Sequence, residues 1–160
     1  MQLPEPTRAD DEAHPIVHRL RALTVELHLL GAEFASRNQL HTTDLRALIC
    51  LLDADRSGDP ATPGLLSDAL GLTSASTTAL VDRLEKAGHI RRSRDTADRR
   101  RVLLEVTPSA MELGWSFFGP LIGAATETIE RFTPDERTTI ERFLVQMAAA
   151  ASATRDELAP

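Results

Sequence analysis

Eight basic side chains gather between residues 83 and 101 of a chain that is otherwise acidic. Only three acidic residues share that stretch, so its formal charge is +5, whereas the remaining residues carry −11. Clustered guanidinium and ammonium groups bind phosphate oxygens, and an anionic remainder confines such binding to one surface. The stretch therefore predicts a compact face for a polyanion. Its basic residues are Arg83, Lys86, Arg91, Arg92, Arg94, Arg99, Arg100 and Arg101.

A run of short side chains immediately precedes the basic stretch: Ser74, Ala75, Ser76, Thr78 and Ala79. Four neighbours recur at the spacing of a buried helix face: Thr77, Leu80, Val81 and Leu84. If those four face a core, a rotation of about 100° per residue leaves Ala75, Thr78, Ala79, Asp82 and Lys86 on the opposite side. Hydroxyl groups bond bases or phosphates and methyl groups contact thymine, so this side suits a DNA major groove.

Apolar spacing predicts the helices that lead up to this site. Apolar residues recur every three or four positions over residues 16–34 and predict a first helix. Thr42 is a suitable N-cap for a second helix that runs through Leu52. Residues 53–60 are rich in Asp, Ser and Gly and predict a loop.

Capping signals place two further helices around the short side chains. Thr62 and Pro63 form an N-cap and N1 pair that opens a short third helix, and Gly71 closes that helix. Thr73 caps a fourth helix, for which Gly88 is the C′ residue. A tight turn joins these two helices, so together they predict a helix-turn-helix.

A two-residue period replaces the helical one after residue 88. Residues 90–94 and 101–107 predict an antiparallel hairpin, or wing, with its bend at residues 95–98. One face of its second strand is apolar and consists of Val102, Leu104 and Val106. Two N-cap and N1 pairs, at residues 107–108 and 133–134, then start two long helices. We therefore expect a mainly α fold with a small β wing.

Residues 70–88 (LGLTSASTTALVDRLEKAG) and 95–108 (DTADRRRVLLEVTP) resemble the MarR (multiple antibiotic resistance regulator) family, and the element order is similar over residues 16–150. The resemblance implies a homodimeric transcription factor, usually a repressor, that a small molecule or an oxidant releases from an inverted-repeat operator. Arg100 matches the family's wing arginine, which enters the minor groove, and Asp98 resembles the acid that orients the wing tip. Similar proteins often carry Arg at the positions of Ser74 and Ala79, so this chain is less suited to guanine readout by that helix.

The short side chains and the basic stretch together form a candidate interface with double-stranded DNA. We expect contacts from Ser74, Ala75, Ser76, Thr78, Ala79, Arg83, Arg94, Arg99 and Arg100. Asp82 lies on the same side and would repel phosphate, so we expect it to form a salt bridge with a wing arginine.

The remaining helices predict a dimer, because the apolar faces of the first and last two need burial beyond what the winged helix supplies. The expected parts are a flexible segment (1–15), a dimerisation helix (16–41), a winged helix-turn-helix (42–107), dimerisation helices (108–152) and a tail (153–160). A small apolar or aromatic effector is expected in a cleft between the dimer helices and the DNA-binding lobe. Its candidate residues are Leu27, Phe34, Leu48, Trp115 and Phe118, for which ordinary core packing is the alternative.

Other functions find little support in the sequence. It contains no phosphate-binding glycine loop, nucleophile elbow or metal-ligand set, so we expect no enzyme, cofactor or metal. His14 and His18 lack a third ligand, and residues 53–64 resemble a calcium loop without its final glutamate. The first 15 residues contain no signal peptide or membrane anchor, which predicts a cytoplasmic protein. The alternatives left open are a winged-helix adaptor that does not bind DNA and a thiol sensor using Cys50, the single cysteine.

Overall fold

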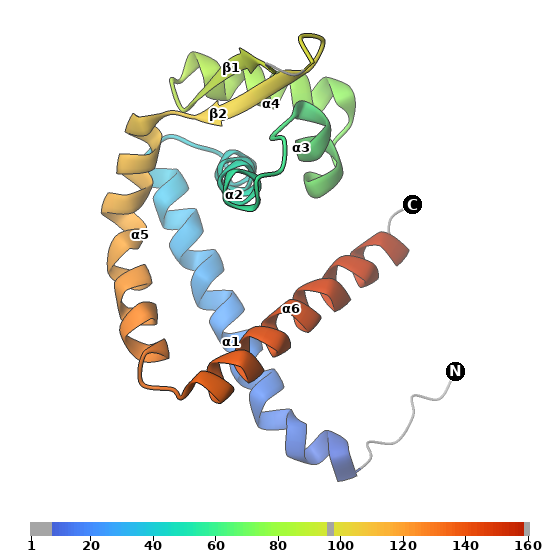
Figure 1. Cartoon of the computed structure of the whole chain (residues 1–160), viewed down its shortest axis with the longest axis vertical. Coiled ribbons are helices and arrows are strands. Elements are labelled where there is room, and N and C mark those ends of the chain that lie inside the picture. Colours follow the sequence, from blue (N-terminus) through green and yellow to red (C-terminus); the bar gives the residue numbers. More distant parts are fainter. Residues whose placement is uncertain (1–7, 96–97, 159–160) are drawn as a thin grey trace. The chain divides into compact units, whose positions relative to one another are not determined.

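The computed structural model describes residues 8–95 and 98–158, with side chains from residue 15 onward (Figure 1). These ranges contain six helices and two strands, which confirms the expected mainly α fold with a small β hairpin. The chain divides into two compact units, unit 1 over Met1–Glu112 and unit 2 over Leu113–Pro160. None of the helices in the described ranges is both long and apolar enough to cross a membrane.

Unit 1 is built on four helices, which are α1 (Arg8–Arg37), α2 (Thr42–Ser57), α3 (Pro63–Leu70) and α4 (Ser74–Lys86). The apolar faces of α2, α3 and α4 meet in one core with the hairpin: Ala47, Leu48, Leu51, Leu66, Leu80, Val81, Leu84, Ile90 and Leu104. The buried residues of α4 are Thr77, Leu80, Val81 and Leu84. The predicted orientation of α4 is therefore confirmed, and its small residues face away from the core.

The predicted caps of α3 and α4 are also confirmed. The Thr62 and Thr73 hydroxyl oxygens accept the backbone N–H groups of Leu65 and Ser76, each at 3.2 Å. Gly71 ends α3 with φ 64°. This left-handed conformation is strained for other residues, so the sharp turn between the two helices depends on glycine.

Two predictions about α2 are wrong. Its N-cap is His41 rather than Thr42, because the Asp44 carboxylate accepts the backbone N–H of His41 at 2.9 Å. The helix also continues through the predicted loop as far as Ser57. Burial of Ala54, which is 5% exposed, outweighs the turn-forming composition of this segment.

The hairpin pairs β1 (Ile90–Arg94) with β2 (Val102–Val106) in antiparallel register, so that Arg92 lies opposite Leu104. Leu104 is buried and donates its N–H to the carbonyl oxygen of Ala61 at 2.8 Å, which ties β2 to the segment before α3. Val102, expected on the same apolar face, is 40% exposed because it lies at the outer end of the strand. Two bend residues, 96 and 97, lie outside the described ranges.

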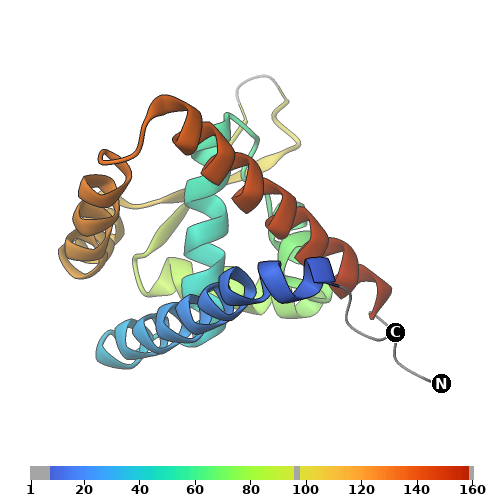
Figure 2. The same ribbon diagram turned by 90° about the horizontal axis from the view of Figure 1, so that it is seen from below.

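Helix α5 (Pro108–Ile129) begins in unit 1 and enters unit 2, which it forms with α6 (Pro134–Glu157). Figure 2 shows α6 as one long unbroken helix. The predicted capping signal at Thr133 is confirmed, since its hydroxyl oxygen accepts the N–H of Glu136 at 3.4 Å and the Glu136 carboxylate accepts the N–H of Thr133 at 2.8 Å. Neither α5 nor α6 contains a buried residue.

Candidate nucleic-acid interface

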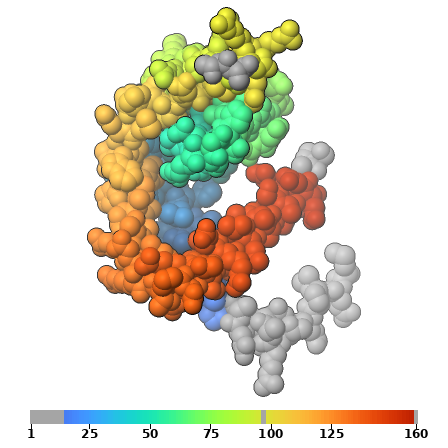
Figure 3. Space-filling view, viewed as in Figure 1, coloured from blue at the N-terminus to red at the C-terminus, as the bar shows by residue number. Residues whose placement is uncertain are grey.

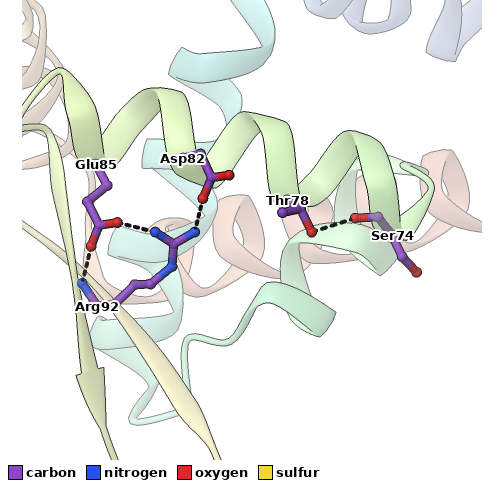
Figure 4. A network of polar contacts seen from close by, with 5 residues as sticks. All are labelled: Ser74, Thr78, Asp82, Glu85 and Arg92. Atoms are coloured by element: carbon purple, nitrogen blue, oxygen red, sulfur yellow. Dashed lines mark hydrogen bonds and ion pairs between the residues drawn. The ribbon is translucent and has the colours of Figure 1, made fainter.

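Helix α4 presents one exposed side along its whole length (Figure 4). Its N-terminal half carries the small predicted residues, and Ser74, Ala75, Ser76, Thr78 and Ala79 are all exposed. Ser74 and Thr78 follow each other on this side, with the Thr78 hydroxyl donating to the Ser74 carbonyl oxygen at 2.9 Å. Short polar and methyl groups are therefore the most accessible features of this end of the helix.

The C-terminal half of the same side carries Asp82, Glu85 and Lys86, and an arginine of the wing pairs with the two carboxylates. Figure 4 shows the Arg92 guanidinium reaching from β1 to the carboxylates of Asp82 and Glu85, with which it forms ion pairs. The Arg92 backbone N–H also donates to Glu85 at 3.3 Å. The hydrogen bond to Asp82, with the nearby Glu85 charge, raises the pKa of Arg92. The predicted salt bridge between Asp82 and a wing arginine is confirmed.

Two further wing arginines have carboxylate partners. Arg91 donates to Glu105 across the hairpin, at 2.8 Å from its Nε atom. Arg101 lies 3.8 Å from the Asp95 carboxylate. Hydrogen bonds from the Ser93 hydroxyl and from Arg91 hold the pKa of Glu105 below its ordinary value. Arg91 and Arg101 therefore pair within the hairpin, whereas Arg92 joins the hairpin to α4.

Four exposed cations of the basic stretch form no ion pair within the ranges the structure describes: Lys86, Arg94, Arg99 and Arg100. The last three are wing residues predicted to contact DNA. In Figure 3 the hairpin residues (yellow) stand out from the surface of unit 1. An unpaired exposed cation is free to neutralise a phosphate, so these side chains are the electrostatic part of the candidate interface.

Asp98 fixes the wing tip as expected. Its carboxylate accepts the backbone N–H of Arg100 at 3.0 Å, and its carbonyl oxygen accepts the N–H of Arg101 at 2.9 Å. The backbone of Arg100 is thereby held while its side chain stays exposed.

Arg83, also predicted to contact DNA, has a partner that sequence reasoning missed. Its Nε lies 3.1 and 3.2 Å from the two carboxylate oxygens of Asp44, and its Nη2 lies 2.5 Å from Oδ1. Asp44 is on α2 and is 1% exposed, whereas the Arg83 side chain is 44% exposed. The only sequence signal was an acidic residue in the first turn of an apolar helix.

The five predicted effector residues occupy different environments. Phe34 and Leu48 are buried in unit 1, whereas Leu27 is 46% exposed. In unit 2, Trp115 is 65% exposed and Phe118 packs edge-on against Phe117 with ring centroids 5.0 Å apart. Two grooves of unit 1, of about 740 and 480 Å³, are lined by none of the five. The shared effector cleft stays a prediction.

The candidate thiol sensor, the histidine pair and the first residues of the candidate calcium loop lie in α1 and α2. Cys50 is half-buried and packs against the core of unit 1. Asp53 and Asp55 lie in the last turns of α2, and Asp53 pairs with Arg56 at 3.2 Å, so the segment is not a calcium loop. His18 is exposed, and the side chain of His14 lies outside the described residues.

Comparison with known proteins agrees with this geometry. A model of the MarR family matches residues 40–102, from the start of α2 to the start of β2. The HTH-type transcriptional regulator YcgE of Bacillus subtilis (strain 168) is 33% identical over 133 residues, which cover 83% of this chain and 82% of YcgE.

Solved structures show the same fold. A mutant of MepR from a multidrug resistant S. aureus clinical isolate has a TM-score of 0.66 at 18% identity, over 85% of this chain and 96% of MepR. The S. aureus MepR-DNA complex has a TM-score of 0.54 at 18% identity, over 84% of this chain and 98% of the MepR chain. The fold is a winged helix-turn-helix, and the predicted family is confirmed. The chain belongs to the MarR family and is a transcriptional regulator, not an enzyme.

Proposed function

We propose that this regulator binds double-stranded DNA at an inverted-repeat operator through the exposed side of α4 and the wing. The observation that carries the proposal is the division of the basic stretch into paired and unpaired cations. Arg94, Arg99 and Arg100 are exposed without carboxylate partners in the described ranges, next to a helix side of small polar residues. Cations that served only to stabilise the wing would be paired, as Arg91 and Arg92 are.

The two parts of the interface would play different roles. The N-terminal half of α4 enters the major groove, where Ser74 and Thr78 bond base edges or phosphates and Ala75 contacts thymine methyl groups. Arg100 enters the minor groove and responds to its width. Because no arginine lies on the N-terminal half of α4, affinity rests mainly on phosphate contacts and on groove shape.

The shared fold supports this mode of binding, since MepR of S. aureus has been solved as a complex with DNA. A regulator that acts on chromosomal DNA in this way would work in the cytoplasm.

We also propose a homodimer. Helices α1, α5 and α6 expose large apolar side chains, including Leu29 at 60%, Trp115 at 65% and Val145 at 63%. Apolar surface of this extent on three helices is typical of an interface between subunits. A second copy covering these faces through a two-fold axis would set the two α4 helices about 34 Å apart, in successive major grooves.

The regulator would act as a repressor that a small apolar or aromatic effector releases. Leu27, Phe34, Leu48, Trp115 and Phe118 remain the candidate effector residues. The effector must prefer the conformation in which the α4 helices are wrongly spaced for the operator, because binding both conformations equally would shift nothing.

The test is selection of duplexes from a random-sequence pool, followed by anisotropy titration of the selected duplex and of a shuffled duplex. We expect an imperfect palindrome whose half-site centres lie about one helical turn apart. Recovery of no preferred sequence, with no duplex bound at low salt, would overturn the proposal and leave the adaptor alternative.

A further inference from the structure

The Asp44–Arg83 pair joins a buried carboxylate of α2 to a half-exposed guanidinium of α4, and among the described residues it is the one ion pair between these two helices. Asp44 is 1% exposed, and its carboxylate receives three groups: the His41 backbone N–H, and Nε and Nη2 of Arg83. The pair thus joins the start of α2 to α4 across 39 positions of sequence.

Other contacts of α4 with the core are apolar. Leu80, Val81 and Leu84 are at most 2% exposed and hold the helix against α2 and the hairpin. Apolar attraction is non-directional, and rotation of the helix is limited only by the close packing of these side chains. The planar fork of an arginine on one carboxylate is directional, and it fixes both the rotation and the axial position of the helix that carries it.

Burying the Asp44 carboxylate is a costly way to stabilise a fold. Removing that carboxylate from water offsets much of the attraction it gains from Arg83, so the pair adds little net stability. Accurate placement is what such a pair supplies in addition. The hydrogen bond to Asp44 raises the pKa of Arg83, and its guanidinium, like that of any arginine, is charged at every physiological pH.

We propose that Asp44 and Arg83 are positioning residues for sequence recognition: the pair sets the rotation of α4 and thereby aims Ser74 and Thr78 at base edges. This inference rests on the proposed DNA binding. In this proposal Arg83 orients α4 through Asp44 and does not make the phosphate contact that its charge alone suggested. Loss of the pair should therefore weaken operator binding while leaving binding to unrelated DNA intact.

The test compares wild type, Asp44→Asn, Arg83→Lys and the double variant on the duplex selected by wild type and on a shuffled duplex. Asparagine keeps an acceptor for the His41 N–H, and lysine keeps a cation beside Asp44, so both changes are mild. The matched controls are Asp53→Asn and Arg56→Lys, the exposed pair on α2. Thermal melts by circular dichroism confirm that each variant is folded at the temperature of the titration.

We expect each single change to weaken binding of the selected duplex on the order of tenfold, with less than about twofold change on the shuffled duplex. The double variant should bind no more weakly than the worse single variant, because both changes break one contact. The affinity of each variant for the selected duplex should fall with salt concentration at the same slope as that of wild type. Both control variants should bind the two duplexes with wild-type affinity.

Two results would overturn the inference. If Arg83→Lys binds the selected duplex as wild type does, Arg83 serves as a simple cation, since lysine also neutralises phosphate. If the variants melt at lower temperature but bind both duplexes normally, the pair is only structural. Should Asp44→Asn fail to fold, Arg83→Lys alone distinguishes these outcomes. Failure of the proposed function looks different, because wild type itself would then select no sequence.

Discussion

Arg92 of the wing is ion-paired with Asp82 of α4, so the side of the recognition helix that is proposed to face DNA carries a carboxylate already neutralised by its own protein. Glu85 shares the same guanidinium. The wing and α4 are thereby joined at the surface, and one of the two negative charges that would repel phosphate is offset.

Arg92→Gln should weaken DNA binding although Arg92 is not assigned a DNA contact. The change uncovers Asp82 and Glu85, and repulsion by these exposed charges should cost on the order of 1 kcal/mol. Anisotropy titration measures the loss, and Arg91→Gln, which uncovers only Glu105, is the matched control. Adding Asp82→Asn and Glu85→Gln should restore the affinity. A triple variant no better than Arg92→Gln would show that neutralisation is not the role of Arg92.

Glu105 should contribute stability that depends on pH. Its hydrogen bonds from Ser93 and Arg91 lower its pKa below the ordinary 4.5. The ionised form is therefore favoured in the folded state, and its contribution is complete above 4.5 and lost as the pH falls through the lower folded value. Melting temperatures of wild type and Glu105→Gln should differ near pH 7 and converge in acid, below the folded pKa of Glu105. A difference that persists or grows in acid would contradict this.

The local chemistry of short segments predicted most of unit 1. The N-cap and N1 pair at Thr62 and Pro63 favours a helix start by local chemistry alone, and the spacing of Thr77, Leu80 and Leu84 defines one face of a helix. These signals are complete within one or two helical turns, so no knowledge of the tertiary fold was needed.

The errors and omissions arose where residues distant in sequence determine the local structure or supply the partner of a side chain. Residues 53–57 have turn-forming side chains, but burial of Ala54 keeps them helical. Asp44 and Arg83 meet across 39 positions, and nothing near either residue indicates the other. In the sequence, the eight cations form one basic stretch. The structure shows that Arg94, Arg99 and Arg100 have no carboxylate partner among the described residues, whereas other cations of the stretch do.

Val145→Arg should disrupt the proposed dimer. Val145 on α6 is 63% exposed, and a charge buried at a subunit interface without a partner is strongly unfavourable. Size-exclusion chromatography with light scattering should show a dimer for wild type and a monomer for the variant. Gln146→Arg, at the adjacent exposed position, is the control and should stay dimeric. A wild type that is monomeric at micromolar concentration would rule out the dimer.

Trp115 should report effector binding. It is 65% exposed and is the only tryptophan, so an aromatic acid that covers it should change its fluorescence. The same titration on the DNA complex should release the duplex, since the two equilibria are coupled. Trp115→Phe removes the signal and identifies its source. Release of DNA with no change in Trp115 fluorescence would place the effector elsewhere.

The most direct test of the central claim is the affinity of wild type, Arg100→Ala and Arg91→Ala for the selected duplex over a range of salt concentrations. Both variants lose one wing cation, but of the two only Arg100 lacks a carboxylate partner among the described residues. Wild type should bind in the nanomolar range at low salt and weaken steeply as salt rises. Arg100→Ala should cost about 1–3 kcal/mol per site and Ser74→Ala less, while Arg91→Ala should stay close to wild type. Equal affinities of Arg100→Ala and wild type, or no binding by wild type at low salt, would contradict the account.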